Sequence, residues 1–248
     1  RTTAGCTTKP DRIKPHCGSR RVRVLLRSQN PNINTRVSVS DQLYQNPSHF
    51  LLELIQNADD TTFSPGVTPS LSLTLFSESD IGYLRTDCNE AGFTFADIDA
   101  ITQVGQSTKK GATNGQRGYI GEKGIGFKSV FKAADIVHVA SGHYEFKFDR
   151  NEHLGMILPI RSAFPTQRLV DHTQFLLQLR DKKDCAEIEA DLHNIEPQLL
   201  IFLKNLRGLN IQIGDTRNSY HLEGDTSAAL GEIVTIHSNQ EGEVTPGK

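Results

Sequence analysis

The stretch that decides the fold is Asn46-Pro-Ser-His-Phe-Leu-Leu-Glu-Leu-Ile-Gln-Asn-Ala-Asp-Asp60, which predicts one helix. Asn46 is a favourable N-cap, and Pro47 suits the first helical turn. At about 100° per residue, the apolar residues of this helix fall on one stripe. That stripe predicts a face packed into the core, and its members are Phe50, Leu51, Leu54, Ile55 and Ala58.

A narrow polar stripe borders the apolar one. Glu53, Asn57 and Asp60 stand at i, i+4 and i+7, so a carboxylate, an amide and a second carboxylate project together. A solvated helix face more often pairs Lys or Arg with Glu, and this stripe carries no cation. The pattern indicates a site for a metal ion or a polar ligand at the edge of the core.

Size and composition set limits on the function. The 248 residues can hold one large or two small domains, and a formal net charge of -2 favours neither nucleic acid nor membrane as a partner. No apolar run approaches the roughly 20 residues that a membrane helix needs. The N-terminus lacks the apolar core of a secretory signal, and the four scattered cysteines form no C-x-x-C pair. We therefore expect an intracellular protein, cytoplasmic or nuclear, with free thiols.

The remaining periodic patterns predict an α+β domain with mostly antiparallel strands and helices on one face. Residues 71–76 and 81–86 alternate with period 2 and predict a hairpin. Further strands are predicted at 136–141, 144–149, 155–160, 174–179 and 209–213, with a short candidate at 233–236. Helical spacing is found at 95–103, 185–192 and 198–206, and residues 37–44 predict a short helix or lead-in.

Glycine-rich segments follow the predicted helix at 95–103. Residues 105–118 contain four glycines and almost nothing apolar, so we expect a mobile segment. Gly121-Glu-Lys-Gly-Ile-Gly-Phe127 then leads into a further helix. Glycines let the backbone approach a ligand closely, and the N–H groups at a helix start favour anions, so this loop suits phosphates. Its spacing matches neither the Rossmann fingerprint nor the P-loop.

The order of these motifs resembles the GHKL ATPases, which include gyrase, heat-shock chaperones, histidine kinases and MutL. Residues 53–60 look like the first motif of that superfamily, residues 121–127 like its later glycine motif, and 105–118 like its ATP lid. The similarity is greatest to the branch that contains sacsin and the plant NO VEIN proteins. It runs from about residue 37 to 213, and the stretches that carry it are 49–60, 89–93, 104–110, 120–131 and 195–203.

This resemblance implies a Bergerat fold, a two-layer α/β sandwich with a flexible ATP lid. Together with the basic start and the polar end of the chain, it gives three expected units. They are a basic, disordered arm over 1–35, the ATP-binding domain over 36–215, and a polar extension over 216–248 that is expected to start a truncated following region. The expected ligands are ATP and Mg²⁺. Asn57 would ligate Mg²⁺, Glu53 would be the general base for the attacking water, and Asp60 would lie near the nucleotide. The other expected nucleotide-binding residues are Gly92, Ser107, Thr108, Lys109, Gly121, Lys123, Gly124, Ile125, Gly126 and Phe127.

The adenine partner is open on the sequence alone. Many GHKL members use an Asp in an Asp-x-Gly-x-Gly motif, whereas this chain has Asp87-Cys-Asn-Glu-Ala-Gly92. Either Asn89 or, by a shift of register, Asp87 fits, and Asn89 is favoured because the branch that this chain resembles has Asn-Glu-x-Gly-Phe at this place. An amide oxygen can accept a hydrogen bond from an adenine amino group, as a carboxylate can. Thr173 stands where the family places a threonine near the adenine.

The resemblance also gives an expectation for the rate of ATP hydrolysis. Several GHKL ATPases need a Lys or Arg from a following domain, so slow or partner-dependent hydrolysis is expected, with other domains of a larger protein or client proteins as partners. The alternative is a non-hydrolysing or nucleotide-free scaffold for protein interaction. Only the basic residues before position 30 favour nucleic acid, which makes it a weak candidate.

Overall fold

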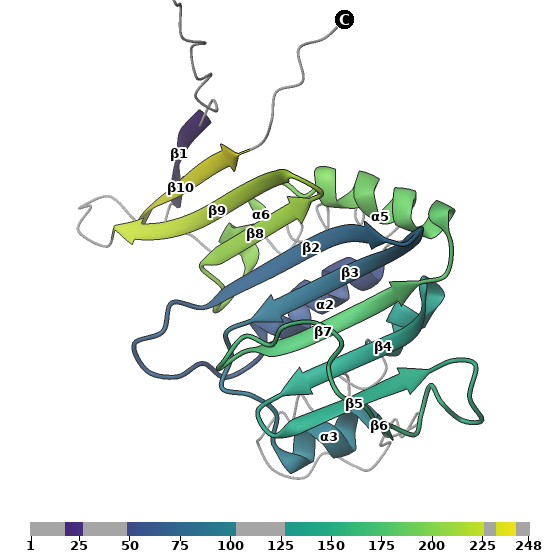
Figure 1. Ribbon diagram of the computed structural model, residues 1–248. Helices are drawn as coiled ribbons and strands as arrows, with labels where there is room; N and C mark the ends of the chain where they lie inside the picture. The colour runs from purple at the N-terminus through teal and green to yellow at the C-terminus, as the bar shows by residue number, and fades with distance from the viewer. Residues whose placement is uncertain (1–17, 27–48, 103–126, 226–231, 242–248) are drawn as a thin grey trace, which may run out of the picture.

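One sheet organises the part of the chain that the computed structural model describes, residues 18–26, 49–102, 127–225 and 232–241. It has ten strands in the order β1-β10-β9-β8-β2-β3-β7-β4-β5-β6 (Figure 1). Among these strands only β2 and β8 run parallel; the other neighbours are antiparallel. The strands are β1 Gly18–Leu26, β2 Ser70–Glu78, β3 Ile81–Cys88, β4 Ala134–Ser141, β5 Tyr144–Asp149, β6 Ile160–Arg161, β7 Thr173–Leu179, β8 Gly208–Ile213, β9 Thr216–Asp225 and β10 Glu232–Glu241.

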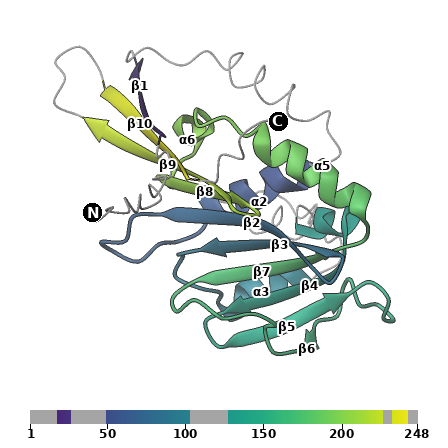
Figure 2. The same ribbon diagram turned by 45° about the horizontal axis from the view of Figure 1, so that its top comes forward.

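The helices gather on one face of this sheet (Figures 1 and 2). They are α2 His49–Asp59, α3 Phe95–Thr102, the 3-10 helix η1 Ser129–Lys132, α5 Lys182–His193 and α6 Leu199–Phe202. The opposite face is crossed by residues 162–172, which we call the strap and which connects β6 to β7. The expected α+β class, with a mostly antiparallel sheet and helices on one face, is confirmed.

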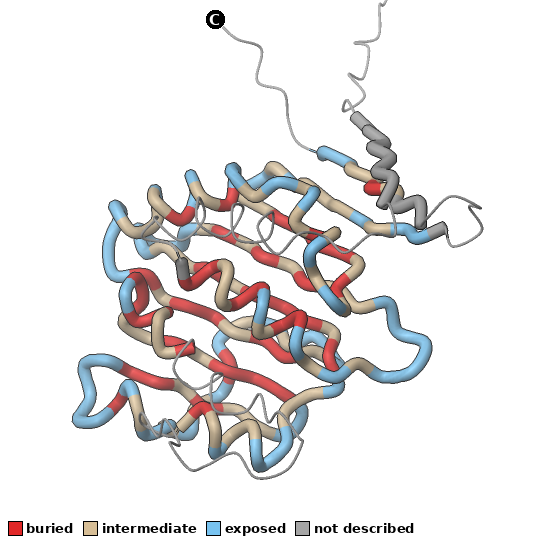
Figure 3. Tube along the Cα trace, turned by 180° about the vertical axis from the view of Figure 1, so that it is seen from behind, coloured by how far each residue is buried: buried red, intermediate tan, exposed pale blue. Residues whose placement is uncertain are grey.

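The helix predicted from the opening stretch is present as α2, and its apolar stripe packs onto the sheet. All five stripe residues are buried, which matches the red segments of the helix seen from behind the sheet in Figure 3. They join Leu73 and Leu84 of the central strands in the main core. The expected cap Asn46 and Pro47 lie outside the described residues, as does the predicted helix at 37–44.

The hairpin of β2 and β3 also follows from its sequence pattern. Leu71, Leu73 and Leu75 are buried, with more exposed residues between them, as period-2 alternation requires. Ser79 and Asp80 close the turn with φ values of 50° and 67°. Left-handed conformations at both central positions suit the right-handed twist of the two strands.

The predicted strand at 155–160 is wrong. Residues 150–158 form turns, and only Ile160 and Arg161 pair with β5. Gly155 is the reason: its carbonyl accepts from the Asp149 N–H at 3.0 Å, and a Cβ at this position would stand 1.9 Å from the Asp149 carbonyl oxygen. The chain is therefore folded back on itself where the apolar residues indicated an extended strand.

The helix predicted at 198–206 is four residues long. Leu203 is extended, with φ -83° and ψ 147°, and ends α6. The next three backbone N–H groups, of residues 204–206, donate to the carboxylate of Asp59. A partner 145 or more residues away in the sequence therefore satisfies donors that a longer helix would have used internally.

The sheet extends past both expected boundaries. Residues 18–26, expected in a disordered arm, form β1, and residues 216–225 and 232–241, expected in a polar extension, form β9 and β10. The short strand predicted at 233–236 is confirmed within β10. These segments are strands because they pair with one another across the sheet: Val22 of β1, for example, lies opposite Ile236 of β10. The local sequence does not indicate such pairing between distant segments.

Candidate functional site

A cavity of about 370 Å³ lies on the helix-covered side, between α2, α3, the loop at 89–94 and strands β3 and β7. Its lining combines apolar side chains with a few carboxylates, hydroxyls and one amide, as is typical of sites for organic ligands. The lining residues are Leu54, Asn57, Ala58, Asp60, Thr61, Thr62, Leu71, Thr86, Cys88, Glu90, Ala91, Gly92, Phe93, Thr94, Asp97, Ala100, Ile101, Phe127, Thr173 and Phe175.

Helix α2 supplies one polar wall of the cavity. Asn57 and Asp60 line it as the polar stripe predicted, with Asn57 half-buried and Asp60 exposed. Glu53 is half-buried one helical turn before Asn57 and is not among the lining residues of the described chain. The structure therefore brings Asn57 and Asp60 of the polar stripe to the cavity, whereas Glu53 is not part of its lining.

The loop at 89–94 supplies a second group of polar lining residues, and its buried acid is Glu90. Glu90 is 7% exposed and lines the cavity. Asn89 does not: its side-chain oxygen accepts from the Ser70 N–H at 2.8 Å, and its amide donates to the Thr68 carbonyl at 2.9 Å. The expectation that Asn89 faces a ligand is therefore replaced by a structural role in which Asn89 fixes the start of β2.

Glu90 was missed in the sequence, although a signal was present. Glu90-Ala91-Gly92 has the acid-x-Gly spacing of the family motif. The sequence-based expectation instead aligned Asn89 with the acid of that motif. Gly92 has φ 91°, a conformation that L side chains rarely adopt. That conformation turns the chain so that Glu90, Gly92 and Phe93 all line the cavity.

A chain of hydroxyl contacts holds the loop against the sheet. The Phe93 N–H donates to Ser141 Oγ at 2.7 Å, and Ser141 Oγ contacts Thr173 Oγ1. Ser141 and Thr173 are both almost fully buried, at the adjoining ends of β4 and β7. Thr173 lines the cavity as expected, and its hydroxyl is held in place by this chain.

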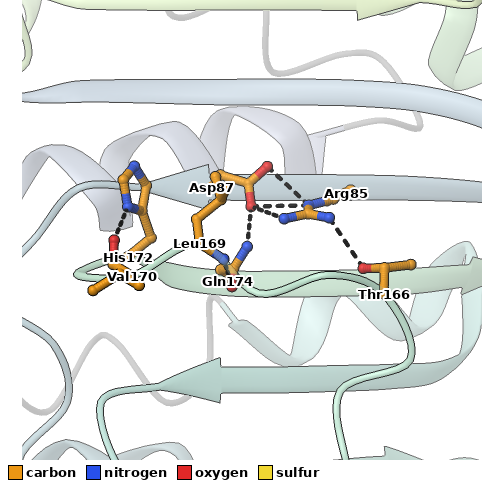
Figure 4. A network of polar contacts seen from close by, with 7 residues as sticks. All are labelled: Arg85, Asp87, Thr166, Leu169, Val170, His172 and Gln174. Atoms are coloured by element: carbon orange, nitrogen blue, oxygen red, sulfur yellow. Dashed lines mark hydrogen bonds and ion pairs between the residues drawn. The ribbon is translucent and has the colours of Figure 1, made fainter.

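Asp87, the alternative adenine partner, faces the other side of the sheet. Thr86 and Cys88 line the cavity, so Asp87 between them points away from it. Its carboxylate accepts from Arg85 Nε at 2.9 and 3.0 Å and also from the side chain of Gln174 (Figure 4). Gln174 in turn accepts from the Leu169 N–H of the strap. Asp87 thus anchors the strap and is excluded from the cavity.

The cavity is rimmed by acid and aromatic side chains. Burial raises the pKa of the Cys88 thiol to about 12, with a further contribution from the charge of Glu90.

Three aromatic rings lie near one another in the cavity lining. The centroid of the Phe127 ring lies 5.4 Å from that of Phe175, and the centroid of Phe175 lies 6.1 Å from that of Phe93. All three aromatic residues line the cavity, so a flat ligand would find ring faces and edges there.

Several expected site residues cannot be placed. Phe127 lines the cavity, but the rest of the glycine loop and the beginning of the expected lid lie outside the described residues. These residues are Ser107, Thr108, Lys109, Gly121, Lys123, Gly124, Ile125 and Gly126. Their roles stay predictions.

The described part of the chain contains no cluster of three or more His, Cys, Asp or Glu side chains arranged around a metal ion. Mg²⁺ often takes one or two protein ligands and completes its shell with waters and phosphate oxygens. The Asn57 amide oxygen at the cavity wall fits that pattern of binding. No helix of the described residues has both the length and the apolar character needed to cross a membrane.

The chain is similar in sequence to a plant protein. Over 191 residues, 68% of this chain, the sequence is 37% identical to Protein NO VEIN of Arabidopsis thaliana. The matched part is 7% of that relative, so the chain spans a small fraction of its length. No family model matches the chain. The similarity supports assignment of the chain to the NO VEIN-like branch.

Proposed function

We propose that this chain is a Mg-ATP-binding module of the GHKL type with a Bergerat fold, and that its hydrolysis of ATP is slow or depends on a partner. The observation that carries the proposal is the cavity between α2 and the loop at 89–94. Asn57 and Asp60 line it from α2 and the turn after it, and the buried Glu90 and Thr173 line it from the loop at 89–94 and from β7. The order of the sequence motifs supports the same assignment.

The two walls suit different parts of a nucleotide. Glu90 and Thr173 are buried polar residues of the cavity lining, and a carboxylate accepts well from an exocyclic amino group. The apolar part of the lining, from residues such as Leu54 and Leu71, suits a base. We assign adenine recognition to Glu90, in place of Asn89 or Asp87.

The α2 wall suits the phosphates. Asn57 would hold Mg²⁺ together with phosphate oxygens, and Mg²⁺ would neutralise the phosphate charge beside Asp60. Glu53, one turn earlier on α2, would orient a water molecule and accept its proton. Other domains of a larger protein, or client proteins, are the partners that would complete the site.

Calorimetric titration tests the binding proposal. We expect a non-hydrolysable ATP analogue with Mg²⁺ to bind the wild-type protein and to lose that binding in Asn57→Ala. Asn218→Ala on β9, outside the cavity lining, is the matched control and should bind like wild type. Binding that survives Asn57→Ala would remove the metal role, and a wild-type protein that binds no nucleotide would remove the function.

A comparison of bases tests Glu90. Inosine triphosphate lacks the exocyclic amine of ATP, so wild-type protein should prefer ATP by about tenfold or more, as expected for a hydrogen bond to a charged group. Glu90→Gln should reduce that preference. An unchanged preference in Glu90→Gln would show that another residue reads the base.

The second candidate is a nucleotide-binding module that does not hydrolyse ATP. It is favoured by the position of Glu53, which is outside the cavity lining of the described residues. Turnover measured in wild type and Glu53→Ala separates the two candidates. Hydrolysis abolished in Glu53→Ala while nucleotide affinity is kept supports the ATPase. No turnover in either protein, with nucleotide still bound, excludes slow hydrolysis by the chain alone and supports the non-hydrolysing module over it.

A further inference from the structure

Asp59 is a buried carboxylate at the end of α2 with a complete set of hydrogen bonds. It is 6% exposed and accepts from the backbone N–H groups of Lys204, Asn205 and Leu206 at 2.7, 2.7 and 2.8 Å. The Asn205 side chain also donates to the Asp59 carbonyl at 2.6 Å. We call these four hydrogen bonds the Asp59 clamp.

The position of this charge is unusual for a helix. A carboxylate in the last turn of a helix opposes the helix dipole, and burial adds a desolvation cost. Three backbone donors offset both costs, and they do so only while residues 204–206 keep their place. Asp59 therefore ties the end of α2 to one conformation of a turn that lies far away in the sequence.

Residues next to Asp59 line the cavity. Asn57, Ala58, Asp60 and Thr61 all belong to its wall, and Thr61 Oγ1 donates back to the Ala58 carbonyl at 2.8 Å. The clamp thus holds the segment that carries the proposed metal ligand, although Asp59 itself is not among the lining residues.

The turn at 204–207 is also joined to the sheet. The N–H groups of Arg207 and Gly208 donate to the Pro69 carbonyl at 2.9 and 3.1 Å, next to the start of β2. The Leu222 N–H of β9 donates to the Arg207 carbonyl at 2.7 Å. The last turn of α2, the start of β2 and strand β9 are therefore connected through one short turn.

We infer that Asp59 is a positioning residue for the nucleotide site: it sets the placement of Asn57 and Asp60, and nucleotide binding is coupled through it to the turn at 204–206. The inference rests on the proposed function. Because coupling free energies are reciprocal, a ligand that needs the clamped conformation must in turn stabilise the turn.

Variants of both sides of the clamp test the positioning role by calorimetric titration. Asp59→Asn should weaken binding of the Mg-bound ATP analogue by roughly tenfold or more, the range seen when residues behind a metal ligand are changed. Asn205→Ala, which removes only the side-chain donor, should weaken it less. Adenosine, which carries no phosphate to bind Mg²⁺, should lose less affinity than the Mg-bound analogue in Asp59→Asn.

The control is Leu192→Ala on α5, a buried position outside the cavity lining that should lower thermal stability. It should leave nucleotide affinity within about twofold of wild type, provided that titration is done well below its unfolding temperature. Affinity lost equally in Leu192→Ala and Asp59→Asn would show a general effect of stability and overturn the inference.

Hydrogen exchange on the wild-type protein keeps the inference testable if Asp59→Asn does not fold. Addition of the Mg-bound analogue should slow exchange of the amides of residues 204–206, none of which lines the cavity. Unchanged exchange there in a protein that binds the analogue would overturn the inference and leave the proposed function standing. Failure of the wild-type protein to bind any nucleotide would overturn both.

Discussion

Asp87→Asn tests whether the acid on the strap side of the sheet is structural. Asp87 and Arg85 are 8% and 15% exposed, and their atoms lie 2.9 Å apart. Loss of one partner from a buried pair costs about 3–5 kcal/mol. Because Arg85 keeps some exposure and a hydrogen bond to Thr166, we expect the low end, about 3 kcal/mol less free energy of unfolding. At about 2–4 °C per kcal/mol for a chain of this size, the melting temperature should fall by roughly 6–12 °C.

Urea denaturation at neutral pH, with a matched thermal melt, measures this loss. The control is Asp80→Asn, whose pair with Lys182 is exposed and whose effect should stay within about 0.5 kcal/mol. Nucleotide affinity should stay within about twofold in Asp87→Asn, since Asp87 points away from the cavity. A variant that is as stable as wild type, or one that is stable but binds no nucleotide, would refute the structural role.

Three further predictions concern single residues. Gly92→Ala should lower stability by about 1–2 kcal/mol and weaken nucleotide binding, because its φ of 91° is strained for any L side chain; urea melts and titration check this. Burial raises the pKa of Cys88 to about 12, so iodoacetamide at pH 8 should label Cys88 in unfolded but hardly in native protein, as peptide mapping would show. Hydrogen bonds from the Phe164 N–H and Arg168 lower the pKa of Glu145, so its stabilising effect is present above its ordinary pKa of 4.5 and lost as pH falls through the lowered value. Melts at several pH values should show a shallower acid loss in Glu145→Gln, and an equal loss would contradict the prediction.

The elements that follow from the sequence are those with a strong local period. The stripe of α2 and the alternation of β2 each fix which face is buried, so their type and their inner face were predictable. Asn57 and Asp60 reach the cavity for the same reason, since helical spacing alone places them together. Residues that a single helix or strand brings together can therefore be predicted from the sequence.

The missed features depend on contacts between elements. Gly155 turns the chain because of the Asp149 carbonyl, and residues 204–206 leave the helix because Asp59 accepts their N–H groups. Glu90 reaches the cavity because Gly92 takes a left-handed conformation and Asn89 is held by β2. The periodic patterns of the sequence do not indicate these contacts between distant residues. The Glu90-x-Gly92 spacing, however, could have indicated how this loop aligns with the family motif.

The pairing of β1 with β10 has a mechanical consequence. Gly18 lies opposite Gln240 and Leu26 opposite Glu232, so the start of β1 and the end of β10 are neighbours at one corner of the sheet. Tension applied between residues 18 and 241 would pull across the pair and open its hydrogen bonds one after another, as a zipper opens, instead of shearing them all at once. The first structure to yield under tension would be this edge pair, while the cavity, the other eight strands of the sheet and α2 would still be intact.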